Sequence, residues 1–372
     1  MRILQINMEK GWRGGESQTL LSMEQFRQAG HEVELLARAN QELALRAKND
    51  DFTVHTQKKA YQIAFFFLLG RARKYDIIHC QTANSLTWAA LFRSFFKGKL
   101  VYTRRTAFPV KERREQSTKK KWQKADLFVA NTFAGMLEAQ RLKVIDSVMS
   151  VEEFKQATKS GNRSNLIIPS ATVPEEFDAT RFKNIIDKHN LRGKKIIAVI
   201  AALTEEKEPL VQIHAIHQLA QQRQDFAVLH FGAGKMLEEC KAKVHELGLE
   251  STYLFMGFQK QVEQLFKGFD AYLLCSRYEG ANNGIINSFF NEVPVVSTAS
   301  GGPNELIGEQ NERGYLCPVG DSTAIAQALN LALDKSSDTQ ERINRAKAYA
   351  QANHTVEVMA QRYLEAYQNL LS

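Results

Sequence analysis

Residues 270–296 constrain the fold more than any other part of the chain. They open with a short apolar run, 270–275, which is typical of a strand buried in a parallel sheet. A polar loop punctuated by glycine follows, residues 283–292 predict a helix, and 294–296 open the next strand. A strand, a glycine-containing turn and a helix start place free backbone N–H groups at the carboxyl edge of a parallel sheet. Phosphate groups bind at such edges.

A carboxylate stands beside this predicted anion site, because Glu279 comes just before the helix start. A carboxylate is ill suited to hold phosphate, since both groups are negatively charged. It is well suited to accept hydrogen bonds from hydroxyl groups. The pattern therefore indicates a ligand in which a sugar is attached to phosphate.

The remaining sequence alternates between strand and helix patterns. The predicted strands are 2–8, 31–37, 76–80, 99–103, 126–131, 165–169, 196–203, 226–231, 252–257, 270–275 and 294–296. The predicted helices are 16–29, 62–74, 85–96, 132–142, 236–247, 262–266, 283–292, 322–333, 338–352 and 355–371. The polar stretch 175–195 is interpreted as the crossing between domains. In a chain of 372 residues, this alternation predicts two doubly wound α/β halves with a cleft between them.

Composition indicates a soluble globular protein, with 44% apolar and 24% charged residues. The N-terminus has a strand pattern and lacks the long apolar run of a signal peptide. The longest apolar run, 63–69, is far shorter than the about 20 residues needed to cross a bilayer. We therefore expect a cytoplasmic protein. The four cysteines are scattered, which predicts buried thiols and no metal site.

At the stretch that begins with Glu279, the chain resembles the retaining glycosyltransferases of family 4, which have the two-domain GT-B fold. The family pattern is Glu-Gly-Phe-Gly, a helical turn, a second Glu and a Pro-Val-Val strand. Glu279-Gly280 matches the first Glu-Gly, and 294–296 matches the strand. Asn287 stands where the second Glu holds the ribose hydroxyls in the family. Asn offers one carbonyl acceptor and two donors in place of a charged acceptor.

Two further motifs resemble the phosphate-binding parts of the family. Lys207 matches the Lys of Gly-Arg-Leu-x-x-x-Lys-Gly, whose Arg and Lys clamp the donor diphosphate, but Ala202 stands in place of the Arg. Gly14-Gly15 matches a Gly-Gly pair that contacts donor phosphate or acceptor across the cleft. The alternative interpretation of Lys207, and the less favoured one, is a plain surface lysine. Read without the resemblance, the glycine pair indicates only a tight turn with positive φ.

Other positions depart from the family pattern or match it weakly. The family carries His-Gly after the strand 99–103, whereas this chain has Arg104-Arg105, a variant found in some bacterial members. A guanidinium is a permanently charged fork suited to phosphate or carboxylate. His79 ends a strand in a pattern that the family shares, and a histidine there is more often structural than catalytic.

The resemblance implies a site without metal in which Glu279, Lys207 and Arg105 act on the reacting groups. The donor-binding residues that it implies are Gly14, Gly15, Ser170, Gly232, Gly234, Gly280, Asn282, Asn283, Gly284 and Asn287. The implied domains are 1–175, an acceptor domain, and 190–353, a nucleotide-sugar domain. The last helix, 354–372, is expected to return to the first domain.

Residues 97–124 form the most basic stretch of a chain whose net charge is +8. A charge run of this kind is often only a solvated surface. The stretch also fits contact with the anionic inner face of the cytoplasmic membrane or with a phosphorylated glycan. Nucleic acid fits the charge, but no recognition module for it is present.

The resemblance implies transfer of a sugar from a nucleotide-diphosphate sugar to a hydroxyl of a glycan or lipid-linked glycan, with retention at the anomeric carbon. Assembly of lipopolysaccharide or another bacterial cell-surface glycan is the expected setting. No cofactor is expected beyond the donor substrate. Two alternatives remain open: a GT-B relative that works as a sugar-nucleotide epimerase or phosphorylase, and a non-catalytic GT-B binding protein.

Overall fold

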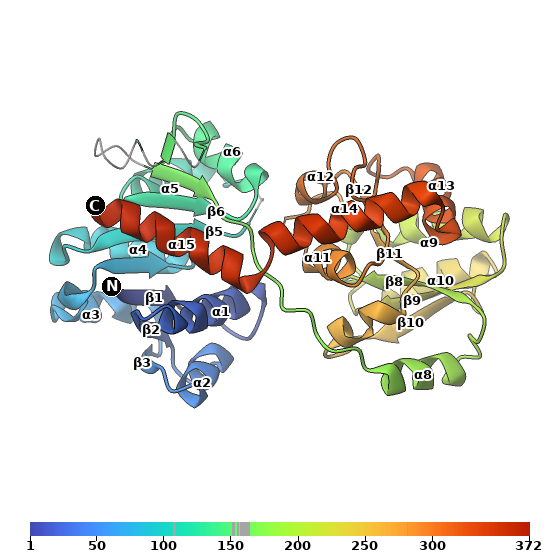
Figure 1. Cartoon of the computed structure of the whole chain (residues 1–372), viewed down its shortest axis with the longest axis horizontal. Helices are drawn as coiled ribbons and strands as arrows, with labels where there is room; N and C mark the ends of the chain where they lie inside the picture. The colour runs from blue at the N-terminus through green and yellow to red at the C-terminus, as the bar shows by residue number, and fades with distance from the viewer. Residues whose placement is uncertain (107–108, 151–152, 155, 157–163, 281) are drawn as a thin grey trace. The chain divides into compact units, whose positions relative to one another are not determined.

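The chain divides into two compact α/β units, each with its own sheet (Figure 1). The computed structural model describes residues 1–106, 109–150, 153–154, 156, 164–280 and 282–372. The first unit comprises Met1–Ala171 and Thr355–Ser372, and the second comprises Thr172–His354. The chain therefore passes from one unit to the other at two places.

The first unit is built on a parallel sheet whose described strands follow the order β3-β2-β1-β4-β5-β6-β7. The strands are β1 (Arg2–Asn7), β2 (Glu32–Arg38), β3 (Thr53–Gln57), β4 (Ile77–Cys80), β5 (Lys99–Arg104), β6 (Leu127–Ala130) and β7 (Ser164–Ile167). The order reverses at β1, which pairs with β2 on one side and β4 on the other. Because all these strands are parallel, the loops that leave β1, β5 and β7 emerge at one edge of the sheet.

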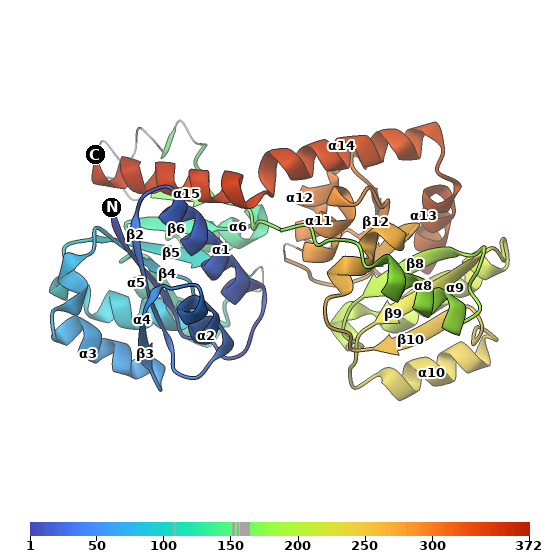
Figure 2. The same ribbon diagram turned by 60° about the horizontal axis from the view of Figure 1, so that its bottom comes forward.

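Helices cover both faces of this sheet (Figure 2). They are α1 (Gly14–Gln28), α2 (Glu42–Asn49), α3 (Ile63–Leu68), α4 (Ala83–Leu91), α5 (Glu115–Trp122), α6 (Phe133–Arg141) and α15 (Val356–Leu371). One core lies between the sheet and α1, α2 and α15. The other lies between the sheet and α3 to α6. The C-terminal helix is thus part of the first unit's own core.

The second unit repeats the plan with the strand order β10-β9-β8-β11-β12-β13 among its described residues. Its strands are β8 (Lys195–Ile200), β9 (Phe226–Phe231), β10 (Tyr253–Gly257), β11 (Ala271–Leu274), β12 (Val295–Thr298) and β13 (Tyr315–Cys317). All the pairings are parallel. Here the order reverses between β8 and β11, so the loops that follow these two strands leave the sheet side by side.

The helices of the second unit again form two layers. They are α8 (Ala179–Lys188), α9 (Pro209–Ala220), α10 (Leu237–Glu246), α11 (Asn283–Phe290), α12 (Gly302–Ile307), α13 (Ser322–Asp334) and α14 (Ser337–Asn353). The core on one face includes α9, α10 and α13. The core on the other face includes α11, α12 and α14, with α8 packed against it.

Three expected elements differ from the structure. The predicted helix 62–74 forms only α3, because Gly70 has φ +68° and turns the chain into a separate 3₁₀ turn, Arg71–Lys74. The predicted helix 85–96 begins earlier, at Ala83, and ends at Leu91. The interpretation of 175–195 as a plain crossing is wrong, since α8 lies within it. The Asp178 side chain caps that helix by accepting a hydrogen bond from the Arg181 N–H at 2.8 Å.

A short polar clamp holds the segment that leaves β7. The side-chain amide of Gln18, on α1, donates to the Ala171 carbonyl at 2.6 Å and accepts from the Ala171 N–H at 2.8 Å. Gln18 is buried, and the backbone N–H and carbonyl of this one residue satisfy both of its side-chain polar groups. The last residue of the first unit's main segment is therefore fixed to the helix that follows β1.

Within the described part of the chain, no helix combines the length and the apolar character needed to cross a membrane.

Candidate functional site

The loop that follows β11 carries Glu279 at the carboxyl edge of the second unit's sheet. Its backbone is fixed to the loop that follows β12, because the Glu279 N–H donates to the Ser300 carbonyl at 2.7 Å. The Gly302 N–H in turn donates to the Glu279 carbonyl at 3.0 Å. The loop that follows β12 therefore holds Glu279 through both its N–H and its carbonyl group.

The Glu279 carboxylate forms an ion pair with Lys207. The Lys207 ammonium donates to Oε2, and the Ser276 hydroxyl donates to the same oxygen at 3.3 Å. Lys207 lies in the 3₁₀ turn Glu205–Lys207 that follows β8. Both side chains are largely buried, with 21% of the Lys207 side chain and 14% of the Glu279 side chain exposed. Lys207 and Glu279 are 72 positions apart in sequence and were both expected in one site. They meet where the strand order of the sheet reverses.

A second ion pair lies beside the first and was not expected from sequence. Arg277 Nε donates to Glu208 Oε1 at 2.8 Å, and the Arg277 N–H donates to the Glu206 carbonyl at 2.9 Å. Glu208 has φ +43°, a left-handed conformation that favours glycine. The positive φ gives a physical reason for the Gly of the Lys-Gly pattern. The only sequence signal for the pair is that Glu208, directly after Lys207, stands where the family pattern has Gly.

The start of α11 is built around Asn282. Its side-chain oxygen accepts from the Ile285 N–H at 3.1 Å and from the Tyr272 hydroxyl at 3.3 Å. A Cβ on Gly284 would lie 2.1 Å from the Tyr272 hydroxyl oxygen, so only glycine fits there. Gly280 has open space around the position of a Cβ, and Asn283 is the first residue of the helix.

Asn287 points one unpaired acceptor into this region. Its side-chain nitrogen donates to the Asn283 carbonyl at 3.0 Å. Its side-chain oxygen is buried and finds no hydrogen-bond partner among the described residues. A buried acceptor without a partner costs about 1–3 kcal/mol, so a ligand hydroxyl that donated to it would recover that free energy.

Gly232 and Gly234 follow β9 and have a packing role. A Cβ on Gly232 would lie 1.8 Å from the Ala201 carbonyl oxygen, and one on Gly234 would lie 2.2 Å from that of Leu203. The two glycines therefore allow the segments that leave β8 and β9 to lie against each other. Their expected role in donor binding stays a prediction.

The remaining predicted residues lie in the first unit. Gly14 and Gly15 open α1, and Arg105 directly follows β5. The Arg105 Cδ would lie 3.9 Å from a Cβ on Gly15, and its Nε is buried without a partner among the described residues. The Ser170 hydroxyl accepts from the Asn131 side chain at 3.3 Å. These residues all stand at the carboxyl edge of the first unit's sheet, on loops after β1, β5, β6 and β7.

The helix start in this unit also carries a buried carboxylate. Glu16 Oε2 accepts from the Arg13 N–H at 3.0 Å, and Oε1 accepts from the Asn7 side chain at 3.4 Å. Both acceptor oxygens therefore satisfy protein donors around the turn after β1. This arrangement fixes the conformation of the Gly14-Gly15 segment.

His79 lies in a buried network in the first unit. Its Nε2 lies 2.7 Å from the Thr103 hydroxyl, and its Nδ1 lies 2.6 Å from the Tyr367 hydroxyl on α15. Burial holds the pKa of His79 well below its ordinary value, and the nearby Arg105 charge lowers it further. A neutral imidazole engaged on both nitrogens serves to join β4, β5 and the C-terminal helix.

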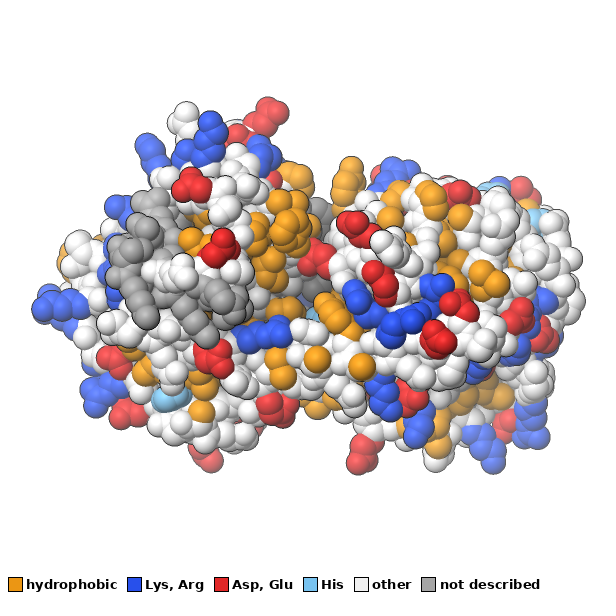
Figure 3. Space-filling view, turned by 45° about the horizontal axis from the view of Figure 1, so that its top comes forward, with side chains coloured by type: hydrophobic (Ala, Val, Ile, Leu, Met, Phe, Trp, Pro, Cys, Tyr) orange, Lys and Arg blue, Asp and Glu red, His pale blue; other side chains and the backbone are white. Residues whose placement is uncertain are grey.

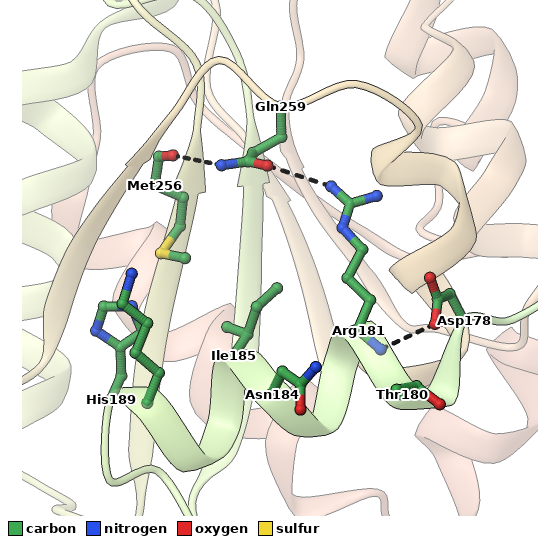
Figure 4. Close-up of a pocket in the computed structure, with 9 residues that line it drawn as sticks. Asp178, Thr180, Arg181, Asn184, Ile185, His189, Met256 and Gln259 are labelled. Carbon is green, nitrogen blue, oxygen red and sulfur yellow. Dashed lines mark hydrogen bonds between the residues drawn. The ribbon is translucent and has the colours of Figure 1, made fainter.

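A pocket of about 470 Å³ lies elsewhere in the second unit, between α8 and the end of β10 (Figure 4). Arg181 crosses its rim and donates to the Gln259 side chain at 3.3 Å and to the Gln261 carbonyl at 3.1 Å. None of the predicted site residues lines it. Among the described residues, no group of three or more His, Cys, Asp or Glu side chains is arranged to hold a metal ion.

Two family models match consecutive parts of the chain. Residues 12–144 match the model described as Glycosyltransferase Family 4, and residues 181–351 match the model described as Glycosyl transferases group 1. The first match includes Arg105 and the second includes Lys207 and Glu279, whereas Ser170 lies outside both.

Two individual relatives are 29% and 22% identical to this chain over the matched residues. An α-1,4-N-acetyl-D-galactosaminyltransferase of Campylobacter jejuni, named for an undecaprenol-diphosphate-linked glycan, is 29% identical over 172 residues, 46% of either chain. A lipopolysaccharide core mannosyltransferase of Rhizobium meliloti is 22% identical over 228 residues, 58% of this chain and 65% of its own. The chain therefore spans about half to two thirds of the length of these curated relatives.

Among solved structures, the HepE protein of Anabaena in complex with UDP superposes with a TM-score of 0.82. The identity is 18%, and the match covers 100% of each chain. At that identity the likeness concerns the fold.

Proposed function

Because the chain belongs to glycosyltransferase family 4, with its GT-B fold, we propose that it transfers a sugar from a nucleotide-diphosphate sugar to a hydroxyl of a glycan or lipid-linked glycan. The observation that carries the proposal is the Lys207–Glu279 ion pair at the carboxyl edge of the second unit's sheet. It places a cation and a hydroxyl acceptor together where a sugar phosphate is expected to bind.

The proposed reaction retains the configuration at the anomeric carbon. The acceptor oxygen attacks the face from which the diphosphate leaves, the bond from the anomeric carbon to the diphosphate oxygen breaks, and the acceptor proton passes to that leaving oxygen. Lys207 and the N-terminal amides of α11 stabilise the negative charge that develops on the diphosphate. No cofactor or metal takes part in this scheme.

The ion pair explains how a carboxylate can stand beside a diphosphate. Without a cation between them, Glu279 and the donor phosphates would repel each other in a largely buried site. Lys207 can neutralise both groups. Its ammonium donates to Glu279 Oε2 and retains further N–H donors for phosphate oxygens. The Glu279 carboxylate then accepts from the hydroxyls of the transferred sugar.

Asn287 takes part in donor binding through its unpaired side-chain oxygen. A ribose hydroxyl can donate to this atom, which replaces the charged acceptor of the family pattern. The missing Arg at Ala202 leaves Lys207 as the basic residue of that motif. Arg105 and the start of α1 give the first unit an anion-binding edge of its own, suited to a phosphate or carboxylate.

The names of the relatives suggest which substrates to test first. The Campylobacter relative is named for a lipid-linked glycan, the Rhizobium relative for the lipopolysaccharide core, and the Anabaena structure holds UDP. We propose a UDP-sugar donor, an acceptor of the bacterial cell-surface glycan type, and a cytoplasmic protein in peripheral contact with the inner membrane face through the basic stretch 97–124. Residues 107 and 108 of that stretch lie outside the described residues.

Calorimetric titration with UDP-, GDP- and ADP-sugars tests the donor. We expect one nucleotide class to bind and Glu279→Ala to weaken that binding. Binding of no donor at all would support a non-catalytic protein. Product analysis with a donor that binds then separates transfer from epimerisation or phosphorolysis, which need no glycan acceptor. The anomeric configuration of the product decides whether the reaction retains it.

A further inference from the structure

Helix α3 of the first unit is apolar on its outer face as well as its inner face. Ile63, Phe66 and Phe67 are buried against the sheet. Phe65 and Leu69 are exposed by 56% and 68%. An ordinary surface helix carries polar residues at such positions, and grouped exposed apolar side chains mark an interaction site. We define the α3 face as Tyr61, Phe65, Leu68 and Leu69, all of them exposed.

Basic residues flank the α3 face on both sides. The segment 58–75 contains five Lys or Arg residues and no acidic residue. Lys58 and Lys59 precede the helix, and Arg71 and Arg73 follow the turn at Gly70; all four are exposed. Within the described residues, no ion pair of these four is found. Lys74, by contrast, pairs with Glu34.

The charges elsewhere are arranged differently. On the face shown in Figure 3, acidic and basic side chains of the second unit lie intermixed. On α14, Arg342 pairs with Asp338 at 2.9 Å and Arg345 pairs with Glu341 at 3.3 Å. Such pairing leaves little net charge, whereas Lys58, Lys59, Arg71 and Arg73 beside the α3 face form no ion pair among the described residues.

The α3 face continues into the neighbouring helices. Helix α4 packs against α3 and ends at Leu91, whose side chain is 67% exposed. Helix α5 packs against α4 and carries Lys119 and Lys120. All three helices cover the same face of the sheet and follow one another across the first unit (Figure 1). Helix α4 therefore separates the α3 face from α5, the helix of the basic stretch 97–124.

We propose that the α3 face inserts its apolar side chains into an anionic lipid surface while the surrounding Lys and Arg side chains bind lipid head groups. Helix α3 has six residues and lies on the surface, so its side chains enter the interfacial layer and do not cross it. The inference extends the proposed function, and rests on it only for the cytoplasmic membrane as the source of the lipid.

Charge favours lipid over a second copy of the chain as the occupant. A twofold contact through the α3 face would bring two basic rims together, and like charges in contact oppose association. An anionic bilayer supplies the opposite charge along the whole rim and an apolar layer for Phe65 and Leu69. Each Lys or Arg near such a surface strengthens binding about fivefold.

Vesicle co-sedimentation without donor or acceptor tests this inference separately from catalysis. The vesicles contain phosphatidylcholine with or without phosphatidylglycerol. We expect binding only with phosphatidylglycerol, weakened about 25-fold by Arg71→Gln with Arg73→Gln, since two charges are lost. Phe65→Gln with Leu69→Gln should also reduce binding at least tenfold, because both side chains leave the apolar layer.

Leu331→Gln, an exposed apolar position on α13 of the second unit, is the matched control and should bind as the unmodified chain does. Circular dichroism and donor binding should be unchanged in all variants, because the altered residues are exposed and outside the site. Unchanged vesicle binding in both double variants would overturn the proposal. A concentration-dependent dimer that Phe65→Gln with Leu69→Gln dissolves, with vesicle binding retained, would overturn it in favour of a second copy.

Discussion

At the residue scale, the Lys207–Glu279 pair makes the sharpest prediction. Lys207→Ala should lower kcat/KM for sugar transfer by about 10²–10³-fold, because one preorganised cation at the leaving group is lost. Lys235→Ala is the control, since Lys235 pairs with Glu205 at 3.0 Å on the surface of the same unit. Its rate should stay within about twofold of the unmodified chain, as surface ion pairs contribute little. Equal rates for the two variants would remove Lys207 from the mechanism.

Glu208 allows a prediction about stability. Its positive φ strains any residue with a Cβ, its Oε2 is buried without a partner among the described residues, and its ion-pair partner Arg277 is 61% exposed. Glu208→Gly should therefore stabilise the second unit by about 0.5–1 kcal/mol relative to Glu208→Ala, because both lose the ion pair and only Gly relieves the backbone. Urea unfolding of both variants measures the difference. An Ala variant as stable as the Gly variant would argue against strain at this position.

At the scale of elements, the junction between β11 and α11 separates packing from ligand binding. Gly284→Ala should destabilise the protein by about 2 kcal/mol or more, because its Cβ would overlap the Tyr272 side chain. Gly280→Ala should change unfolding free energy by less than about 0.5 kcal/mol, since a Cβ there meets open space. Thermal and urea unfolding of the Gly284→Ala and Gly280→Ala variants measure this difference in unfolding free energy. If Gly280→Ala loses donor affinity at normal stability, its role lies in binding.

Sequence predicted most of the parallel strands and the loops that carry Lys207 and Glu279, because buried strands read as continuous apolar runs. It missed α8, whose composition is polar. Only Phe182, Ile185 and Ile186 on one side pack against the core. It missed the Glu208–Arg277 pair, because an ion pair between two loops leaves no periodic pattern. It also missed the α3 face, since a run such as 63–69 does not tell which of its residues will be covered.

At the scale of the whole molecule, each unit contains a buried neutral histidine. Burial lowers the pKa of His230, in β9, to about 4. It also lowers the pKa of His79 in the first unit. The unfolded chain binds a proton at the ordinary value of 6.5, so unfolding takes up protons below that pH. Stability should therefore fall as pH falls from about 6.5 towards 4, by about 1.4 kcal/mol per pKa unit of difference.

Urea unfolding at several pH values measures this loss. His230→Gln should flatten the pH dependence in that window, because it removes the buried imidazole whose pKa is lowered in the folded chain. A His230→Gln variant with the slope of the unmodified chain would show that another group takes up the proton.

The first unit is formed by two segments of the chain, and the ribosome synthesises the whole of the second unit between them. When Met1–Ala171 has left the ribosome, the surface destined for α15 is still bare, and Phe26, His79 and Thr103 lack Tyr363 and Tyr367. The nascent chain must therefore keep this half-built layer from aggregating until its final helix emerges. A fragment of residues 1–171 should be poorly soluble on its own and should become soluble when 355–372 are joined to it by a flexible linker.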